Sequence, residues 1–464
     1  MKKYRYEIII FIIEAICMTL ELIASRVLSP YFGNSNIVWT SVIGIILLSS
    51  SVGNYMGGKI ADKNECEKSL KYIVLEASFF IFLIPIIQTR FLNIVATIIK
   101  DVKIGAIIST IALFFIPSAF LGTIIPIVLK IKLNKIENAG KTSGTVYALS
   151  TIGGIFGTFV SGFLLIPNFG SVQILFVLSI ILSIISFFIS TNKKKLMNII
   201  IAGIITMNVV LLAIYSNNNL KSGEQVLNGE ENTKVSLDTQ YGRVMIYNSE
   251  YNGEEIRIMN IDSGFESATY IDEEKCNELV STYTKYYDLM FKSKYDVDDV
   301  LMIGGAGYSY PKYFISHYED KRMDVVEIDG EITEIAKKYF FLDKLIDDYK
   351  LNENKRLNLI NEDGRTYLNK NKKKYDAILN DAFSGENPAK TLTTLENIKQ
   401  TKEALTENGL YLSNVVSAME GKDSRFIRAE VNTLKRVFKN VYVIPCNPEV
   451  SAETKQNIMV ISTD

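Results

Sequence analysis

The sequence predicts an all-α transmembrane bundle in residues 1–215, followed by an α/β domain with a small β unit at its start in residues 233–464. Apolar runs long enough to cross a hydrocarbon core of about 30 Å occur only in the first half. Patterns of strands and helices alternate only in the second half, which predicts a doubly wound sheet. The polar stretch 216–232 between them is predicted to be a linker.

Seven spans are predicted in the first half, each bounded by a short polar, glycine or proline break. They lie near residues 7–28, 37–57, 70–88, 104–130, 144–166, 171–190 and 197–215. A cleaved signal peptide is disfavoured because the first apolar run is too long and further spans follow. We therefore expect a multi-pass protein of the cell membrane, with the lipid bilayer as a partner.

Basic residues gather in alternate loops, near residues 2–5, 59–71, 130–141 and 193–195. These loops and the amino terminus are therefore expected to be cytoplasmic. Seven crossings from a cytoplasmic amino terminus would place the soluble half outside the cell. A nucleotide ligand would instead be found in the cytosol. An interfacial helix or an extra span within residues 70–131 would resolve the conflict. We expect the soluble domain to be cytoplasmic.

Composition excludes several classes of function. The formal net charge is -1, and no basic patch interleaved with aromatic residues points to a nucleic-acid partner. The four cysteines are scattered without the paired spacing of a zinc site or a disulfide framework. His317 is the only histidine, which removes metal sites built on histidine. No metal cofactor is expected.

The soluble half is predicted to begin with a β unit at residues 233–262. The Asn252-Gly253 pair separates two alternating stretches, 243–248 and 255–260, which is a strong hairpin signal. A Rossmann-like domain at 271–464 is predicted from a helix near 273–291, strands at 299–304, 322–328, 356–360, 375–381 and 409–416, and helices at 310–318, 331–340 and 394–407. Its core strands should be parallel.

Ligands in such sheets bind at the carboxyl ends of the strands, and four predicted strand ends carry suitable groups. They are Gly304, Gly305 and Gly307 in VLMIGGAG, Glu327 and Asp329 in VVEID, Asp363 in NEDGR, and Asp381 in YDAILNDAFSG. Closely spaced glycines alone would be weak evidence, because they also serve helix packing. Four strand ends in register are a much stronger indication of a binding site.

The residue types predict an adenosyl ligand. Glu327 can accept two hydrogen bonds from ribose hydroxyls, Asp363 can accept from an adenine amino group, and the glycine turn leaves room for an amino acid part. Tyrosines follow Gly307, so the turn lacks a full GxGxxG, which disfavours a dinucleotide. Alternatively, Glu327 or Asp363 caps the helix that follows it.

The motifs VLMIGGAG, VVEID, NEDGRTYL and YDAILNDAF, preceded by a small β domain, resemble the spermidine synthase family of aminopropyltransferases. The similarity is greatest to membrane-fused members with a transporter-like bundle before the synthase domain, and it covers about residues 233–464. The resemblance implies a class I methyltransferase-like fold, a homodimer, and S-adenosylmethionine or its decarboxylated form as co-substrate. It makes Glu327 the ribose contact, Asp363 and Glu362 the adenine contacts, and Asp381 the acid that activates the amine.

The chain departs from the family where charge is needed for a cationic acceptor. GGAGYS replaces the GGGDGG of the family, so Gly307 occupies the position of the acid that contacts the amine of the donor. Without that acid, full S-adenosylmethionine becomes a plausible ligand. DAFSG replaces DSSDP or DSTDP, so the second acid is missing. The glutamine and tyrosine of the acceptor pocket are replaced by Glu266 and Cys276, and Glu266 and Glu386 would restore part of the negative charge.

Tyr283 and Tyr287 share one face of the predicted helix at 273–291. They would either line the acceptor pocket or pack in the core. The predicted function is a membrane-integrated transferase that moves an aminopropyl or related alkyl group to a small-molecule amine and releases methylthioadenosine. One alternative is a lyase or cyclase that needs no acceptor. Another is a transporter of polyamines or metabolites with an adenosyl-sensing soluble domain.

Overall fold

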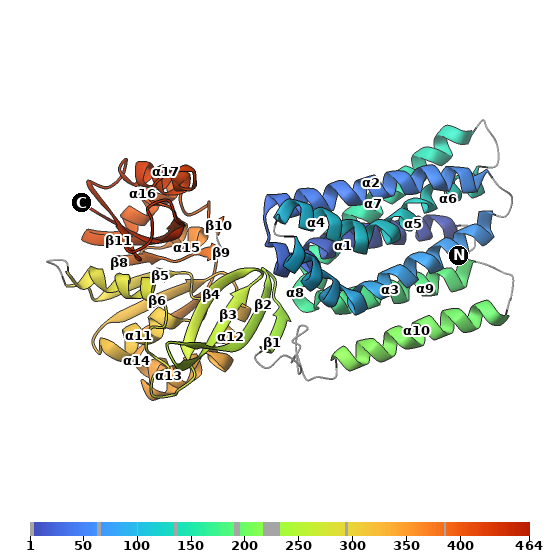
Figure 1. The fold of residues 1–464 in the computed structure, drawn as a ribbon. Helices are drawn as coiled ribbons and strands as arrows, with labels where there is room; N and C mark the ends of the chain where they lie inside the picture. Colours follow the sequence, from blue (N-terminus) through green and yellow to red (C-terminus); the bar gives the residue numbers. More distant parts are fainter. Residues whose placement is uncertain are drawn as a thin grey trace. The chain divides into compact units, whose positions relative to one another are not determined.

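The computed structural model describes residues 4–62, 66–99, 101–133, 138–189, 195–216, 233–292, 296–384 and 387–464. The chain divides into two compact units, and the division falls between residues 228 and 245 (Figure 1). Apart from Ser216, the predicted linker lies outside the described residues. The two units are taken in turn.

Six helices of the described ranges are long and apolar enough to cross a membrane, by length and composition. They are Arg5–Phe32 (α1), Asn36–Ala61 (α2), Cys66–Ile98 (α3), Val102–Lys132, Ala139–Asn168 and Ser171–Ile189 (α9). These helices coincide with the first six predicted spans. The seventh prediction falls on α10 (Lys195–Ser216), whose apolar part Ala202–Ala213 is shorter.

The described residues contain no extra span or separate interfacial helix within 70–131, so that expectation is wrong. Helix α3 continues through Pro85 to Ile98. The next apolar helix, Val102–Lys132, accommodates its prolines by local changes of helix type. It consists of α4 (Val102–Thr110), η2 (Ile111–Phe115), α5 (Ile116–Gly122) and α6 (Ile124–Lys132). The segment η2 is a π-helix that ends just before Ile116-Pro117. Because proline has no N–H and crowds the preceding turn, the hydrogen-bond register shifts there.

The same pattern recurs in the fifth long apolar helix, Ala139–Asn168. Helix α7 (Ala139–Val160) passes through a second π-helical segment, η4 (Ser161–Leu165), into α8 (Ile166–Asn168), which contains Pro167. A Cβ atom added at Gly157 of α7 would lie 2.3 Å from the Ala15 carbonyl oxygen of α1. Glycine therefore allows the backbones of α7 and α1 to approach closely, as the small residues in this stretch predict.

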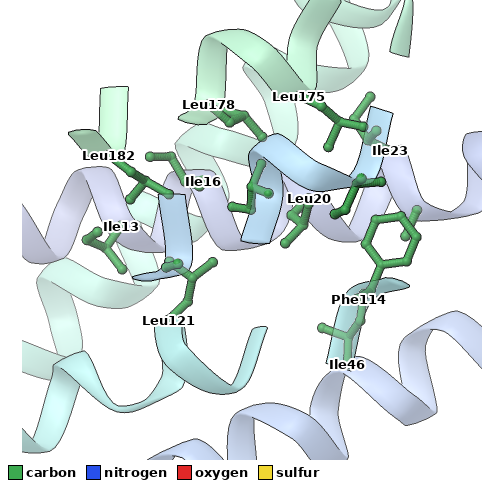
Figure 2. Close-up of a cluster of buried hydrophobic side chains, with 14 of the residues drawn as sticks. Ile13, Ile16, Leu20, Ile23, Ile46, Phe114, Leu121, Leu175, Leu178 and Leu182 are labelled. Atoms are coloured by element: carbon green, nitrogen blue, oxygen red, sulfur yellow. The ribbon is translucent and has the colours of Figure 1, made fainter. Parts of the chain in front are cut away.

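Helix α1 supplies much of the apolar core of the helical unit. Figure 2 shows part of this cluster, to which α1, α2, η2, α5 and α9 contribute Ile13, Ile16, Leu20, Ile23, Ile46, Phe114, Leu121, Leu175, Leu178 and Leu182. These side chains are at most 3 % exposed. The unit therefore has a packed apolar core of its own, separate from that of the soluble unit.

Trp39, the only tryptophan of the chain, lies near the start of α2. Its indole N–H donates to Asn34 Oδ1 at 2.8 Å. The indole is thus fixed next to the loop that joins α1 and α2.

A four-stranded sheet opens the soluble half, in the order β1 (Thr233–Asp238), β2 (Arg243–Tyr251), β3 (Glu254–Ile261) and β4 (Gly264–Tyr270). The predicted hairpin at Asn252-Gly253 joins β2 and β3. The helix predicted near 273–291 is present only in its second part and as a 3₁₀ helix: turns lead into η6 (Thr282–Lys292). β-branched and hydroxyl residues disfavour an α-helix here, and Asp272 Oδ1 accepts from the Glu274 N–H to form a turn instead.

The main sheet has seven strands in the order β12-β13-β11-β8-β5-β6-β7, with five parallel strands from β11 to β7. They are β5 (Asp299–Ile303), β6 (Arg322–Glu327), β7 (Leu357–Asn361), β8 (Tyr375–Asn380), β11 (Leu405–Ser417), β12 (Asn440–Pro445) and β13 (Gln456–Thr463). The doubly wound α/β class is confirmed. The antiparallel pair β12 and β13 was not predicted.

Helices cover both faces of this sheet (Figure 1). Those that follow β5 and β6 are α11 (Ser309–His317), α12 (Gly330–Tyr339), α13 (Leu342–Asp348) and α14 (Leu351–Asn354). On the other face lie α15 (Gly364–Lys370), α16 (Leu395–Ala404) and α17 (Arg425–Leu434). The short elements β9 (Phe383–Ser384), β10 (Asn387–Pro388) and η7 (Lys422–Ser424) complete the unit.

The strand register brings the functional segments to one edge of the sheet. Ile303 at the end of β5 is level with Asn380 of β8 and Val326 of β6. Asn380 is in turn level with Ser413 of β11. The segments that follow β5, β6, β7 and β8 therefore begin at the same edge, which is where doubly wound sheets bind ligands.

Candidate functional site

A cavity of ≈ 780 Å³ lies at this edge of the sheet, and 23 residues line it. It receives the turn after β5, the segment after β8, the start of η6, and parts of β4, β11 and β13. Five predicted site residues line it together: Glu266, Tyr283, Gly304, Gly305 and Asp381. The structure thus gathers residues that lie up to 115 positions apart.

Asp381 follows β8, and both oxygens of its carboxylate are held. Tyr283 donates its hydroxyl to Oδ2 at 3.1 Å, and Asn414 donates its amide to Oδ1 at 2.9 Å. Burial raises the pKa of Asp381 above its usual range, and the hydrogen bonds from Asn414 and Tyr283 oppose that rise. Burial and the nearby Asp381 raise the pKa of Tyr283, so its hydroxyl stays protonated and acts as the donor.

The other predicted acceptor-pocket residues differ in position. Glu266 of β4 lines the cavity. Tyr287 is fully buried, packs edge-on to Tyr283 at 6.5 Å between ring centroids, and is absent from the lining. Burial and the nearby Asp381 raise the pKa of its hydroxyl. Glu386 lies outside the described residues. Cys276 is buried, its carbonyl oxygen accepts from Lys312, and it does not line the cavity.

Gly304 joins the glycine turn to the Asp381 segment through close backbone contact. Its φ is +95°, and an added Cβ would lie 2.6 Å from the Asp381 carbonyl oxygen. The Gly304 N–H donates to the Val326 carbonyl, and the Asp381 N–H donates to the Ile303 carbonyl, both at 2.9 Å. Only glycine satisfies this backbone conformation and this spacing together.

Gly307 does not line the cavity. The lack of an acidic side chain at this position was expected to make room for the carboxylate of S-adenosylmethionine. A Cβ added to it would lie 2.5 Å from Ser267 Oγ and 2.9 Å from Phe340 Cδ1. The Ser267 hydroxyl is in turn 2.8 Å from Ser309 Oγ. The volume that an acid at position 307 would need is therefore filled by Ser267 and Phe340, and the loss of the acid opens no space at this position.

Glu327, at the end of β6, holds the glycine turn. Its Oε2 accepts from the N–H groups of Gly305 at 2.8 Å and Ala306 at 3.1 Å, and its Oε1 accepts from the Asp329 N–H at 3.0 Å. A carboxylate offers about four acceptor positions, so about one remains, on Oε1. Glu327 can therefore accept about one ribose hydroxyl without losing a backbone partner, and not the two expected from its residue type.

The remaining predicted ligand contacts follow the ends of β6 and β7 and do not line the cavity. Asp363 caps α15, because its Oδ1 accepts from the Thr366 N–H at 2.8 Å; the capping alternative is thus realised. Asp329 caps α12 in the same way through the Glu331 N–H at 3.0 Å. Glu362 forms an ion pair with Lys370 at 2.5 Å. Their roles toward an adenosyl ligand stay predictions.

A buried polar network lies in the strands next to Asp381. Asn380 donates to Tyr411 at 3.0 Å and, at a longer 3.4 Å, to Ser413 Oγ. Ser413 donates to Glu430 Oε1 at 3.0 Å, and Glu430 is only 3 % exposed. Burial raises the pKa of Glu430 to about 7, against which the Ser413 hydrogen bond acts weakly. Glu430 thus changes charge inside the core near neutral pH.

Glu430→Gln is expected to stabilise the soluble unit at alkaline pH. Because folding raises this pKa to about 7 from an ordinary 4.5, the wild type loses stability as pH rises through that window. Between about pH 5.5 and 8.5 the wild type should lose about 2 kcal/mol relative to the variant. Thermal unfolding at both pH values measures this difference. A difference that does not change with pH would contradict the ionisation of Glu430 in the core.

The cavity residues that were not predicted include Ser267, Asn414 and Asn457. Asn414 could have been found, because it lies near the end of the predicted strand 409–416, where the same strand-end rule applies. Asn457 lies on β13, whose antiparallel pairing with β11 depends on a contact across about forty residues. Ser267 lies in the unpredicted strand β4.

Comparisons with known proteins agree with the sequence motifs. Residues 285–463 match the family described as "Spermine/spermidine synthase domain". A polyamine aminopropyltransferase of Vibrio vulnificus is 32 % identical over 157 residues, which are 33 % of this chain and 47 % of that protein. A polyamine aminopropyltransferase of Thermoplasma volcanium is 27 % identical over 210 residues, which are 45 % of this chain and 70 % of that protein.

Solved structures are also similar to this chain. A probable spermidine synthase from Corynebacterium glutamicum aligns with a TM-score of 0.42 at 20 % identity, covering 52 % of this chain and 80 % of that one. The chain spans about half the length of several curated relatives that it matches, 47 % and 50 % for those of Vibrio vulnificus and Pyrococcus abyssi. The family match over residues 285–463 and the curated relatives confirm the resemblance of the soluble half to spermidine synthases.

Proposed function

We propose that the chain is a membrane-integrated transferase that moves an aminopropyl or related alkyl group from an adenosylsulfonium donor to an amine. The donor would be decarboxylated S-adenosylmethionine or S-adenosylmethionine. The observation that carries the proposal is Asp381, an acid held at the end of β8 inside a large cavity. It lies within the stretch that matches spermine and spermidine synthases.

Asp381 supplies the base that this transfer requires. An amine is protonated in neutral water, so its proton must leave before the nitrogen can attack. In the proposed step Asp381 takes one proton from the ammonium group, and the freed nitrogen lone pair forms a C–N bond to the methylene next to the sulfonium. The C–S bond breaks with its electron pair on sulfur, which leaves neutral methylthioadenosine. Positioning and deprotonation are then the main work of the protein.

The surroundings of Asp381 suit this role. Tyr283 and Asn414 each occupy one acceptor position on a different carboxylate oxygen, so about two of four positions remain for an ammonium group. Glu266, on the same cavity, can attract a cationic acceptor. Because the pKa of Asp381 is raised, activity is expected to fall on acidification at a higher pH than an ordinary aspartate would give.

Purified full-length protein tests the proposal when it is incubated with each donor, with and without a panel of amines including putrescine. Mass spectrometry then identifies the products. We expect methylthioadenosine release that depends on an amine, together with an alkylated amine in equal amount. Release without an acceptor would replace transfer by a lyase or cyclase reaction. Adenosyl binding with no release under any condition would favour a transporter that senses an adenosyl metabolite.

A second test concerns Glu327 as the ribose contact. Since about one acceptor position of its carboxylate remains, only one ribose hydroxyl should depend on it. We expect either 2′-deoxy or 3′-deoxy methylthioadenosine, but not both, to bind about tenfold more weakly than methylthioadenosine. Calorimetric titration measures the three affinities. Equal large losses for the two analogues would show that Glu327 accepts two hydroxyls.

We also propose that the soluble unit faces the cytosol. The six long apolar helices and the basic loops support a bilayer protein with a cytoplasmic start. Six crossings return the chain to that side, where adenosyl donors are found, and the proposal therefore requires that α10 (Lys195–Ser216) does not cross. Protease should therefore cleave the soluble unit in inside-out vesicles and spare it in sealed right-side-out vesicles. The reverse pattern would place the soluble unit outside.

A further inference from the structure

Asn414 connects Asp381 to a second amide, on β13. The Asn414 side chain donates through Nδ2 to Asp381 Oδ1 at 2.9 Å, and its Oδ1 accepts from Asn457 Nδ2 at 3.1 Å. Asn414 is 4 % exposed, so water has little access to replace either partner. The strand register places Val416 opposite Asn457, which brings position 457 diagonally next to position 414.

The two ends of an asparagine amide have nearly the same shape and opposite hydrogen-bonding character. Which end faces Asp381 is therefore decided by the partners of Asn414 rather than by packing. An N–H of Asn457 on the Asn414 oxygen requires the Asn414 nitrogen to face the carboxylate. If the amide turned over, its oxygen would face the carboxylate oxygen, which replaces an attraction by a repulsion.

We propose that Asn457 is a positioning residue for the transfer step, because it fixes the amide of Asn414 so that an N–H always points at Asp381. This inference rests on the proposed function, in which Asp381 is the base. Its effect would be to keep the carboxylate ionised and in one orientation, with its free acceptor positions directed at the amine. Asn457 itself acts only through Asn414.

The titratable groups around Asp381 bear on any change in its ionisation. Tyr283 and Tyr287 of η6 and Cys446 after β12 act electrostatically with Asp381, and Glu266 of β4 acts on Tyr283. Asn414 and Asn457 carry no charge and titrate nowhere near neutral pH. We call the two hydrogen bonds from Asn457 to Asn414 and from Asn414 to Asp381 the relay. A substitution at 457 changes the orientation of the Asn414 amide in this relay without removing any of these titratable groups.

Asn457→Asp is the variant that should rotate the Asn414 amide by half a turn and so reverse the direction of the relay. The new carboxylate, when ionised, cannot donate, so the Asn414 amide is expected to turn its nitrogen toward β13 and its oxygen toward Asp381. We expect kcat for methylthioadenosine release to fall about 10- to 100-fold with little change in the KM for the donor. The acidic limb of the pH profile should move to higher pH. Asn457→Gln keeps a donor and should recover much of the loss.

Gln456→Glu is the matched control for the added charge. It places a carboxylate on the adjacent residue of the same cavity wall and keeps an acceptor oxygen for the Asn447 N–H, now at 2.8 Å from Gln456 Oε1. Its loss of kcat should be several-fold smaller than that of Asn457→Asp. Equal losses in the two variants would overturn the relay. Retained binding of methylthioadenosine shows that each variant is folded.

A readout without turnover separates this inference from the proposed function. The infrared band of protonated Asp381, identified by its loss in Asp381→Asn, should titrate at higher pH in Asn457→Asp than in Gln456→Glu. Equal midpoints would overturn the relay even in a protein that releases methylthioadenosine. A wild type that releases none under any condition, with the midpoints separated as expected, would overturn the proposed function and leave the relay standing.

Discussion

Asp381→Asn is expected to lower the rate of methylthioadenosine release by about 10²- to 10⁴-fold and to leave methylthioadenosine binding intact. The amide cannot take the proton of an ammonium group, whereas the predicted adenosyl contacts lie on other strands. Single-turnover kinetics with a saturating donor measure the chemical step, and calorimetry measures the binding. Retained turnover would remove Asp381 as the base.

Asp376→Asn is the matched control for this experiment. Asp376 lies on the same strand, β8, near its opposite end, and its Oδ2 accepts from the N–H groups of Asp298 and Asp299 at 3.1 Å. The amide oxygen of an asparagine can still accept these bonds. Turnover should therefore stay close to that of the wild type. Losses of similar size in both variants would mean that charge in the domain, and not the base at the cavity, limits the reaction.

Gly304→Ala should have the largest effect on stability. At φ +95° any side chain is strained, and here the added Cβ would also lie 2.6 Å from the Asp381 carbonyl oxygen. The backbone must move, so we expect a loss of about 3 kcal/mol, or an unfolding temperature lower by about 6 to 12 °C. Displacement of Asp381 should lower turnover by a further factor of about 10².

Gly253→Ala separates the two causes. Gly253 also has a positive φ, +79°, but nothing lies within 4 Å of its added Cβ. Its loss of stability, about 1 kcal/mol, therefore reports the backbone conformation alone. The excess at Gly304 reports the contact with the Asp381 segment. If the two variants lose the same stability, the glycine turn and Asp381 are not coupled through the backbone.

The strand-end rule explains how much of the site the sequence could predict. Parallel strands with continuous apolar stretches are visible in sequence, and their carboxyl ends meet at one edge, so Gly304, Glu327 and Asp381 could be placed on that edge without a structure. What each side chain does there depends on its backbone neighbours. Two examples are the hydrogen bond from the Gly305 N–H to Glu327 and the packing of Ser267 against Gly307. Both join residues that lie far apart in the sequence, so the sequence alone does not show them.

The errors of prediction also have physical causes. The segment before β5 has apolar residues at helical spacing, but turn-forming and β-branched residues make it a 3₁₀ helix, and this brings the Tyr283 hydroxyl to Asp381. The prolines near Pro117 suggested an interruption of the span. A π-helical segment absorbs them within one continuous helix, because a change of hydrogen-bond register costs less than leaving backbone groups without partners in apolar surroundings.

The position of Trp39 makes the two units separable in spectroscopy. It is the only tryptophan, so emission excited at the red edge of absorption comes from the helical unit alone. The soluble unit emits only through tyrosine, including Tyr283 and Tyr310 on the cavity. An adenosyl compound that binds without altering tryptophan emission leaves the surroundings of Trp39 unchanged, whereas a change in tryptophan emission would record a signal that reaches the helical unit. A simple titration in a fluorimeter can thus tell a self-contained enzyme from a sensor.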